Sequence, residues 1–252
     1  MNRAFLALIV GAAVGLASST QASAAPASKS ASKPMAEPKA KALPNTRTGI
    51  SIQGKSALFG PYSMQVGDGL NIRAKFGFTI WDMNKPNEVN MLNAENHVVF
   101  RDTAAGWLKW NRRGVPLIKV SEVERVDKVS IAGQPCVRYC GYQLVKGEKL
   151  KVAEFTCLQN SPINQKVVDF WCRHFLIPSK YGFPIAVRQR VGDRLEIVLE
   201  TNSIRVIPAS TISVQVPKDY KETKDKANLY FADVGGGMSK SDFESFFQQP
   251  LK

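Results

Sequence analysis

The sequence predicts a mainly β protein, built as one curved antiparallel sheet that a short helix covers. Short runs rich in β-branched and aromatic residues recur from Gly49 to about Tyr220, which is the pattern of strands. The spacers between them are short turn segments, and connections this short force neighbouring strands to be antiparallel. One stretch in this region, Asn164–Phe175, has apolar residues at helical spacing instead.

Roughly ten strands are expected in this region. Gly67-Asp68-Gly69 and Asn84-Lys85-Pro86-Asn87 mark turns in its first half, and Lys146-Gly147-Glu148-Lys149 and Gly192-Asp193 mark hairpins in its second. The strands are placed at Ile50–Gln53, Leu58–Val66, Leu70–Lys75, Phe78–Trp81, Glu88–Leu92, His97–Phe100, Val123–Val129, Val137–Val145, Lys151–Leu158, Phe183–Val191 and Leu195–Val206.

The helix is expected to start after the cap residue Asn164 and to end before Pro178. Its apolar face would carry Val168, Trp171, Cys172 and Phe175. Apolar and polar residues in the same stretch also alternate as they would in a strand, so a strand is the alternative interpretation.

A sheet this long has one broad apolar face, which must curl and be covered to escape water. Because one short helix is too small to fill a curved sheet, a hollow for an apolar ligand is expected beneath it. The predicted ligand-binding residues are Val168, Trp171 and Phe175 on the helix, with Phe78 and Trp81 on the sheet. In the alternative, large side chains such as Phe76, Phe78, Trp81 and Phe100 fill the space unaided.

The N-terminus has the three parts of a secretory signal peptide, predicted at residues 1–24. A positive start at Arg3 precedes the apolar run Ala4–Ala17, and Ala22-Ser23-Ala24 supplies small residues for cleavage. The run is shorter than the roughly 20 residues of a membrane-spanning helix. The chain is therefore expected to be exported to the periplasm or secreted, and not to span a membrane.

Two terminal segments are expected to flank the β domain, which is assigned to residues 47–222. Residues 25–46 are rich in Ala, Ser, Pro and Lys and predict a disordered linker. In the tail, residues 223–252, a capping box of Ser241 and Glu244 predicts a short amphipathic helix. That helix has three open fates: docking on its own domain, lying on a membrane, or binding a partner.

The net charge is +13, and removal of Arg3 with the signal leaves +12. The excess is spread along the chain, which favours loose attraction to anionic surfaces over one specific partner. In a cell envelope those anions are lipid head groups and acidic wall polymers, so no nucleic acid partner is expected.

Four cysteines, Cys136, Cys140, Cys157 and Cys172, predict two disulfides in an exported chain. Four cysteines allow three pairings, and the sequence alone does not choose among them. Folding the hairpin about Glu148 and Lys149 would place Cys140 opposite Cys157, which makes this the better-supported bridge; Cys136 and Cys172 would then pair. A zinc site is disfavoured because no Cys-x-x-Cys pair occurs and His174 lacks ligand spacing. No metal and no cofactor are expected.

Nothing in the sequence predicts an enzyme. No nucleophile elbow, zinc-protease or phosphate-loop pattern occurs. A helix would point Cys172 and His174 in different directions, which disfavours a catalytic pair. Trp107 and Trp110 precede two arginines and could contact lipid or sugar, although core packing of one and partial exposure of the other is the simpler interpretation.

Three local patterns taken together resemble the periplasmic lipoprotein-carrier superfamily, the Lol-type outer-membrane lipoprotein-sorting proteins and their uncharacterised relatives. The patterns are the strand–Gly–strand step Val126–Tyr139, the strand opening Gly182-Phe183-Pro184-Ile185, and the segment Val214–Tyr220. The resemblance implies a half-open barrel around an apolar cavity, closed by helices, that binds a lipid or lipoprotein acyl chain. No functional position of the carriers is transferred to this chain. An envelope interaction module, tethered by the basic linker and the tail, is the alternative.

Overall fold

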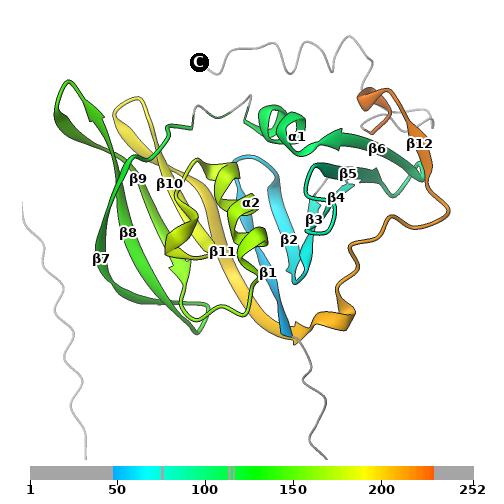
Figure 1. Ribbon diagram of the computed structural model, residues 1–252, viewed down its shortest axis with the longest axis horizontal. Helices are drawn as coiled ribbons and strands as arrows, with labels where there is room; N and C mark the ends of the chain where they lie inside the picture. Colours follow the sequence, from blue (N-terminus) through cyan, green and yellow to red (C-terminus); the bar gives the residue numbers. More distant parts are fainter. Residues whose placement is uncertain (1–47, 75–76, 113–114, 116, 230–252) are drawn as a thin grey trace, which may run out of the picture. The chain divides into compact units, whose positions relative to one another are not determined.

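Two meanders of strands meet side by side and form one large curved sheet (Figure 1). The computed structural model describes residues 48–74, 77–112, 115 and 117–229. The first meander contains β1 (Thr48–Ser56), β2 (Gly60–Val66), β3 (Gly69–Ala74), β4 (Gly77–Asp82), β5 (Glu88–Asn93) and β6 (Val98–Thr103). The second contains β7 (Glu122–Ile131), β8 (Gln134–Val145), β9 (Glu148–Leu158), β10 (Pro184–Val191) and β11 (Arg194–Pro208).

The two meanders are joined in the centre of the sheet by antiparallel pairing of β1 with β11. The strand order is β12-β6-β5-β4-β3-β2-β1-β11-β10-β9-β8-β7, so β7 forms one edge. At the other edge, the short β12 (Lys221–Thr223) pairs in parallel with β6. The two edges do not pair with each other, and the sheet is therefore not closed.

Tight turns and bulges give the sheet its shape. The β7–β8 and β8–β9 hairpins each turn through two residues with positive φ, Ala132-Gly133 and Lys146-Gly147, which is the backbone of the turn that matches strand twist. Register shifts leave one extra residue in β11 opposite Gln53/Gly54 of β1, one in β7 between Arg125 and Asp127, and one in β9 opposite Gly141/Tyr142 of β8. Bulges bend a strand and increase its twist, and here they curl the sheet.

Two α-helices lie on the concave side of the sheet (Figure 1). The first, α1 (Ala104–Asn111), follows β6, and α2 (Gln165–Phe175) lies between β9 and β10. Short 3-10 turns follow at η1 (Ser179–Tyr181), η2 (Ala209–Thr211) and η3 (Lys226–Leu229).

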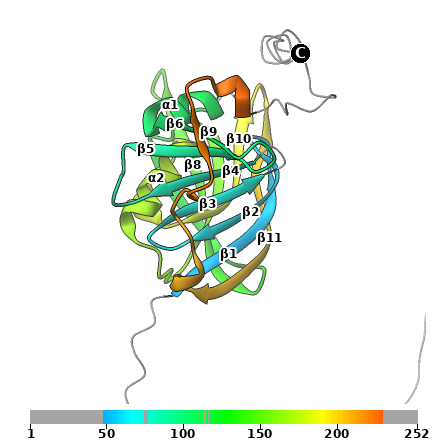
Figure 2. The ribbon, with the colours of Figure 1, turned by 90° about the vertical axis from the view of Figure 1, so that its right-hand side faces the viewer.

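The convex side of β3–β6 is covered by the chain that follows η2, which runs across these strands to β12 (Figure 2). Val214, Val216 and Tyr220 from this segment pack against Ile80, Leu92 and Val99. Asn71 donates its side-chain amide to the carbonyl of Ser213 at 3.0 Å, which fixes the segment to β3. This half of the sheet is therefore buried on both faces.

The structure confirms the predicted fold class and all of the expected strands. The helix is also confirmed, with Asn164 as its N-cap accepting a hydrogen bond from the Lys166 amide at 3.0 Å. Two features were not predicted, namely α1 and the parallel pairing of β12. The expected signal peptide, linker and tail helix lie outside the described residues.

Candidate functional site

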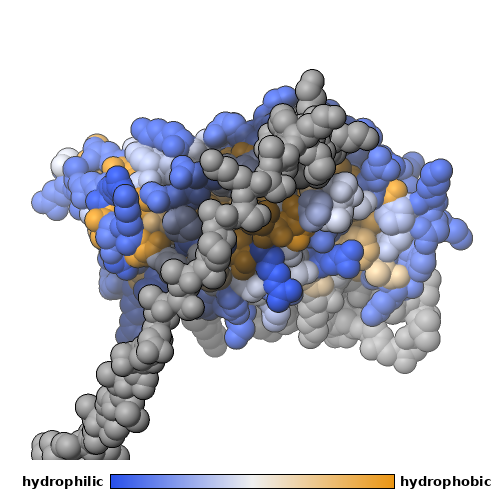
Figure 3. All heavy atoms as spheres, turned by 90° about the horizontal axis from the view of Figure 1, so that it is seen from below, coloured by the Kyte–Doolittle hydropathy of each residue, from blue (hydrophilic) through white to orange (hydrophobic). Residues whose placement is uncertain are grey.

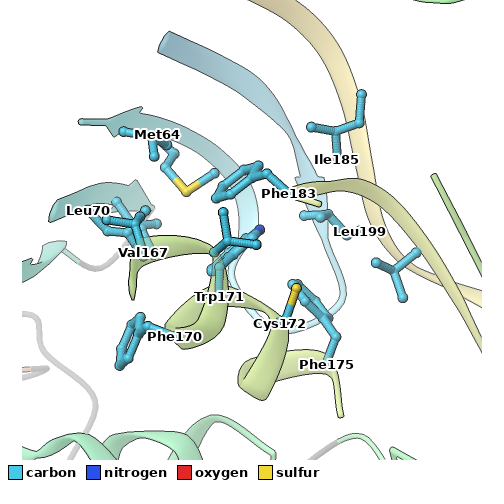
Figure 4. Close-up of a cluster of buried hydrophobic side chains, with 14 of the residues drawn as sticks. Met64, Leu70, Val167, Phe170, Trp171, Cys172, Phe175, Phe183, Ile185 and Leu199 are labelled. Carbon is cyan, nitrogen blue, oxygen red and sulfur yellow. The ribbon is translucent and has the colours of Figure 1, made fainter. Parts of the chain in front are cut away.

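Helix α2 packs its apolar face into the concave side of the sheet (Figure 4). Trp171 has no exposed surface, and its indole donates a hydrogen bond to the carbonyl of Pro184 at 3.1 Å. Phe170 and Phe175 are also fully buried. The surrounding side chains come from β2, β3, β10 and β11, and include Met64, Leu70, Ile185 and Leu199. In this region the core is filled by side chains.

Polar contacts fix both ends of α2. Beyond the cap at Asn164, the C-terminal carbonyl of Phe175 accepts a hydrogen bond from the buried Gln189 of β10 at 2.6 Å. Arg112, just after α1, donates from Nε to the carbonyl of His174 at 3.2 Å and also bonds to the carbonyl of Arg173. A cation at this end suits the helix dipole. The helix is thereby held as a fixed cover.

The five predicted ligand-binding residues do not surround one hollow. Trp171, Phe175 and Trp81 lie in the filled core, where the Trp81 ring stacks on Phe170 with 4.3 Å between centroids. Phe78 lies three residues before Trp81 on β4 and therefore on the opposite face. There it packs against Tyr220, with 6.1 Å between ring centroids. Of the five, only Val168 lines an open space.

That space is an open cleft of about 520 Å³ between α2 and the β7–β9 end of the sheet. Its apolar lining comes from β8, β9, α2, Ile163 in the loop after β9, and Phe183 just before β10. Its polar lining comes from the loop after β9, from β7 and from η1. The lining includes Lys128, Val137, Tyr139, Cys157, Ser161, Val168, Lys180, Tyr181 and Phe183.

An aromatic cluster forms one wall of the cleft. Tyr139 of β8 lies opposite Phe155 of β9, and their ring centroids are 5.4 Å apart. Tyr181 of η1 lies 4.9 Å from Tyr139 and 6.2 Å from Phe155. Burial raises the pKa of the Tyr139 hydroxyl, so this group is uncharged near neutral pH.

Gly182 allows the turn after η1 to pass close to the end of β9. Its φ is +104°, a conformation that residues with a side chain rarely adopt. A Cβ on Gly182 would also lie 3.2 Å from the carbonyl oxygen of Leu158. The glycine therefore lets Tyr181 and Phe183 reach the cleft from either side of it.

The predicted disulfides are wrong for this structure, in which all four cysteines are free and buried. Cys140 pairs with Glu154, and Cys157 pairs with Val137. The hairpin turns at Lys146-Gly147, where φ is positive, and not at Glu148 and Lys149. Cys140 and Val137 are three apart on β8, so Cys140 and Cys157 point to opposite faces of the sheet.

The other predicted pair, Cys136 with Cys172, is separated in the same way. Cys136 shares the face of Cys140, whereas Cys157 faces the cleft and α2. The Cys172 thiol lies 3.5 Å from the carbonyl oxygen of Gly182. Burial, with the negative charge of Asp169, raises the pKa of Cys172 to about 12, and burial also raises that of Cys157. Neither thiol is an activated nucleophile.

His174 is fully buried in a stack of aromatic rings. The centroid of its ring lies 5.3 Å from that of Phe59, 5.0 Å from that of Trp107 and 5.4 Å from that of Trp171. Neither ring nitrogen has a hydrogen-bond partner among the described residues. Burial, with the nearby charge of Arg112, lowers the pKa of His174 to about 3, so the ring is neutral at physiological pH.

The other sequence candidates lie away from the cleft. His97 is exposed and contacts Asp219 at 2.7 Å. Trp107 is buried and Trp110 half-buried, as the simpler interpretation predicts. Among the described residues, no three His, Cys, Asp or Glu side chains are grouped so that they could hold a metal ion.

Most of the cleft residues were not predicted from the sequence. Tyr139 could have been found, because Val137, Tyr139 and Gly141 alternate along one face of β8. Lys128 and Lys180 carried no such signal, since their positions depend on how β7 and η1 come together. The surface seen from below is mixed in character, with apolar side chains visible between hydrophilic ones (Figure 3).

A scan against models of known protein families finds no match for this chain, and a search of curated proteins finds none either. In the part of the chain that the structure describes, no helix has both the length and the apolar character needed to cross a membrane.

Proposed function

We propose that this chain is an exported, non-enzymatic protein that binds a lipid or lipoprotein acyl chain in the cleft between α2 and β7–β9. The cleft itself is the observation that carries the proposal. Its volume of about 520 Å³ lies within the range of small-molecule sites, roughly 300–1,000 Å³. The proposed site lies at the N-terminal end of α2, and not beneath its middle as the sequence predicted, because the space under the middle of the helix is filled.

The lining of the cleft suits an apolar chain. Tyr139 and Tyr181 are half-buried and offer aromatic surface, and the buried Val137, Val168 and Phe183 lie behind it. Covering such surface with an acyl chain stabilises the complex by about 25 cal/mol per Å² of apolar area removed from water. The open side allows a ligand to enter without displacing the helix.

A curved, unclosed sheet with a helix on its concave side also agrees with what the resemblance to lipoprotein carriers implies. On this proposal the chain acts in the periplasm or outside the cell. Its basic excess would favour residence near anionic lipid or wall polymer.

The chemistry in the cleft supports binding in preference to catalysis. Cys157 is the one cysteine that lines it within the described residues, and burial raises its pKa. His97 and His174 both lie elsewhere. A nucleophile without a lowered pKa or a neighbouring base reacts poorly.

The test is titration of the full chain with a fluorescent fatty acid, comparing Tyr139→Ala with Tyr142→Ala. Tyr142 lies on the same strand but packs against Lys149 and does not line the cleft. Tyr139→Ala should weaken binding about tenfold, since an aromatic contact of 1–1.5 kcal/mol is lost, whereas Tyr142→Ala should bind as the unchanged chain does. Absence of acyl binding, or equal effects of both changes, would reject the proposal.

One observation favours the alternative, an envelope interaction module. Strand β7 is ten residues long and forms an edge of the sheet, so one side of it is unpaired within the described structure. A partner strand could add to such an edge. If no apolar ligand binds, this edge can be tested by purifying the unchanged chain and the Val126→Pro variant from the native envelope. The substitution lies at the bulge of β7, and a partner that binds this edge should co-purify with the unchanged chain and be lost from the variant.

A further inference from the structure

Two lysines face the cleft from different elements. Lys128 projects from β7, where it lies opposite Val137 of β8, and Lys180 belongs to η1. The Lys180 ammonium lies 5.1 Å from the ring centre of Tyr181. Both lysines line the same cleft as Tyr139 and Tyr181.

Neither lysine has an ion pair within the described residues, in contrast to other cations of these strands. Lys149 lies 2.9 Å from Glu122, Lys151 lies 3.0 Å from Glu154, and Arg138 lies 2.6 Å from Asp127. Several cations of β8 and β9 are thus paired with acids, whereas Lys128 of β7 and Lys180 of η1, like Arg125 of β7, have no ion pair within the described residues.

No Asp or Glu is among the described residues that line the cleft. Asp169, one turn into α2, accepts a hydrogen bond from Gln165 at 2.8 Å and lies outside the lining. The hydroxyl of Tyr139 is neutral near pH 7, as tyrosine ordinarily is, and burial raises its pKa further. The cleft thus combines the aromatic wall of Tyr139 and Tyr181 with two positive charges, and no negative charge lines it among the described residues.

We propose that the cleft selects ligands that carry an anionic head group, a carboxylate or a phosphate, on an apolar chain. The head group lies between Lys128 and Lys180, and the chain lies against Tyr139 and Val168. This inference rests on the proposed function and adds the chemical class of the ligand. Each exposed charge pair should improve affinity about threefold, and the two together about tenfold.

The experiment titrates the full chain at neutral pH with 11-(dansylamino)undecanoic acid and, separately, with its methyl ester. The acid should bind about tenfold more tightly, and added salt should reduce that advantage. The double change Lys128→Gln and Lys180→Gln should remove the preference by weakening the acid alone. Lys55→Gln with Lys218→Gln, exposed positions outside the cleft, removes the same charge and should change nothing.

Three outcomes would overturn the inference, and they differ in what they say of the proposed function. Equal affinity for acid and ester, or equal losses in the two double variants, would reject head-group selection while acyl binding stands. Failure of both probes to bind would reject the proposed function as well. Displacement of the acid by inorganic phosphate as readily as by decanoate would show a site for free anions, against a chain-bearing ligand.

Discussion

The two ends of the sheet differ in how their concave face is covered. Toward β1–β4 and β10–β11, α2 presents Phe170, Trp171 and Phe175, which are fully buried in the hydrophobic core. Toward β8 and β9, the same helix presents the smaller Val168 and Cys172, and there the cleft opens.

The difference shows that side-chain size on the covering helix decides where a curved sheet is filled. Protein cores pack to a density that leaves few voids, so bulky residues close the space wherever they reach. A cleft survives where small residues of the helix meet a part of the sheet that curls away from it. The fold alone therefore predicts a covered sheet, and the side chains determine the site.

Truncation in the filled region should have the largest effect. Trp171→Ala should lower the free energy of unfolding by about 3–5 kcal/mol, because it removes a fully buried indole and leaves a cavity. Urea denaturation measures this, with the half-buried Trp110→Ala as the matched control. A loss below about 1 kcal/mol would contradict the packed core.

The buried histidine should make the filled region sensitive to acid. The pKa of His174 is lowered to about 3 in the folded state, while an unfolded histidine has a pKa near 6.5. The unfolded state therefore binds the proton first, and stability contributed by the neutral ring falls as pH drops below 6.5 toward 3. Between pH 7 and pH 5 the loss should be about 2 kcal/mol.

His174→Phe keeps a ring in the stack and removes the group that titrates. The variant should therefore lose about 2 kcal/mol less than the unchanged chain between pH 7 and pH 5. His97→Phe, at an exposed position, controls for loss of a histidine as such. Parallel pH profiles for His174→Phe and the unchanged chain would count against a buried neutral ring.

In the open region the same kind of truncation should cost less. Tyr139 is half-buried, with one side toward the cleft. Tyr139→Ala should therefore lower the free energy of unfolding by about 1–2 kcal/mol, well below Trp171→Ala. Equal losses at the two positions would erase the distinction between the filled and open regions.

Reduction should have the smallest effect. All four thiols are free and buried, so a reductant should change neither the mass nor the melting temperature. A thiol reagent at pH 8 should react with the cysteines only after denaturant is added, since burial hinders access and raises the pKa of Cys172 to about 12. Envelope-derived protein whose mass rises on reduction would show bridges that this structure lacks.

The parts of the fold that depend on local chemistry could be predicted from the sequence. The strands follow from residue type and turn residues, and α2 follows from its cap and its apolar face. Helix α1 also had a signal that was not used: Thr103 caps it by accepting a hydrogen bond from the Gly106 amide at 3.0 Å, and Ala104, Trp107 and Leu108 recur at helical spacing.

The parts of the fold that depend on long-range strand register could not be predicted from the sequence. The hairpin turns at Lys146-Gly147, and β9 has one extra residue opposite Gly141/Tyr142. Together these two features place Cys140 opposite Glu154, three residues from the predicted partner Cys157. An odd shift exchanges the faces of the sheet, which removed both predicted bridges. The cleft likewise depends on the approach of η1 to β8, which no local pattern encodes.

The most direct test of the account is an NMR titration of the isotope-labelled full chain with decanoate. Decanoate should change the chemical shifts of backbone amides around the cleft, at Lys128, Tyr139, Ser161 and Tyr181. The indole signals of Trp81 and Trp171, two buried side chains that donate hydrogen bonds to the carbonyls of Pro86 and Pro184, should stay in place. Shifts of these two indoles with silent cleft amides would contradict the account, because the ligand would then enter the region described here as filled.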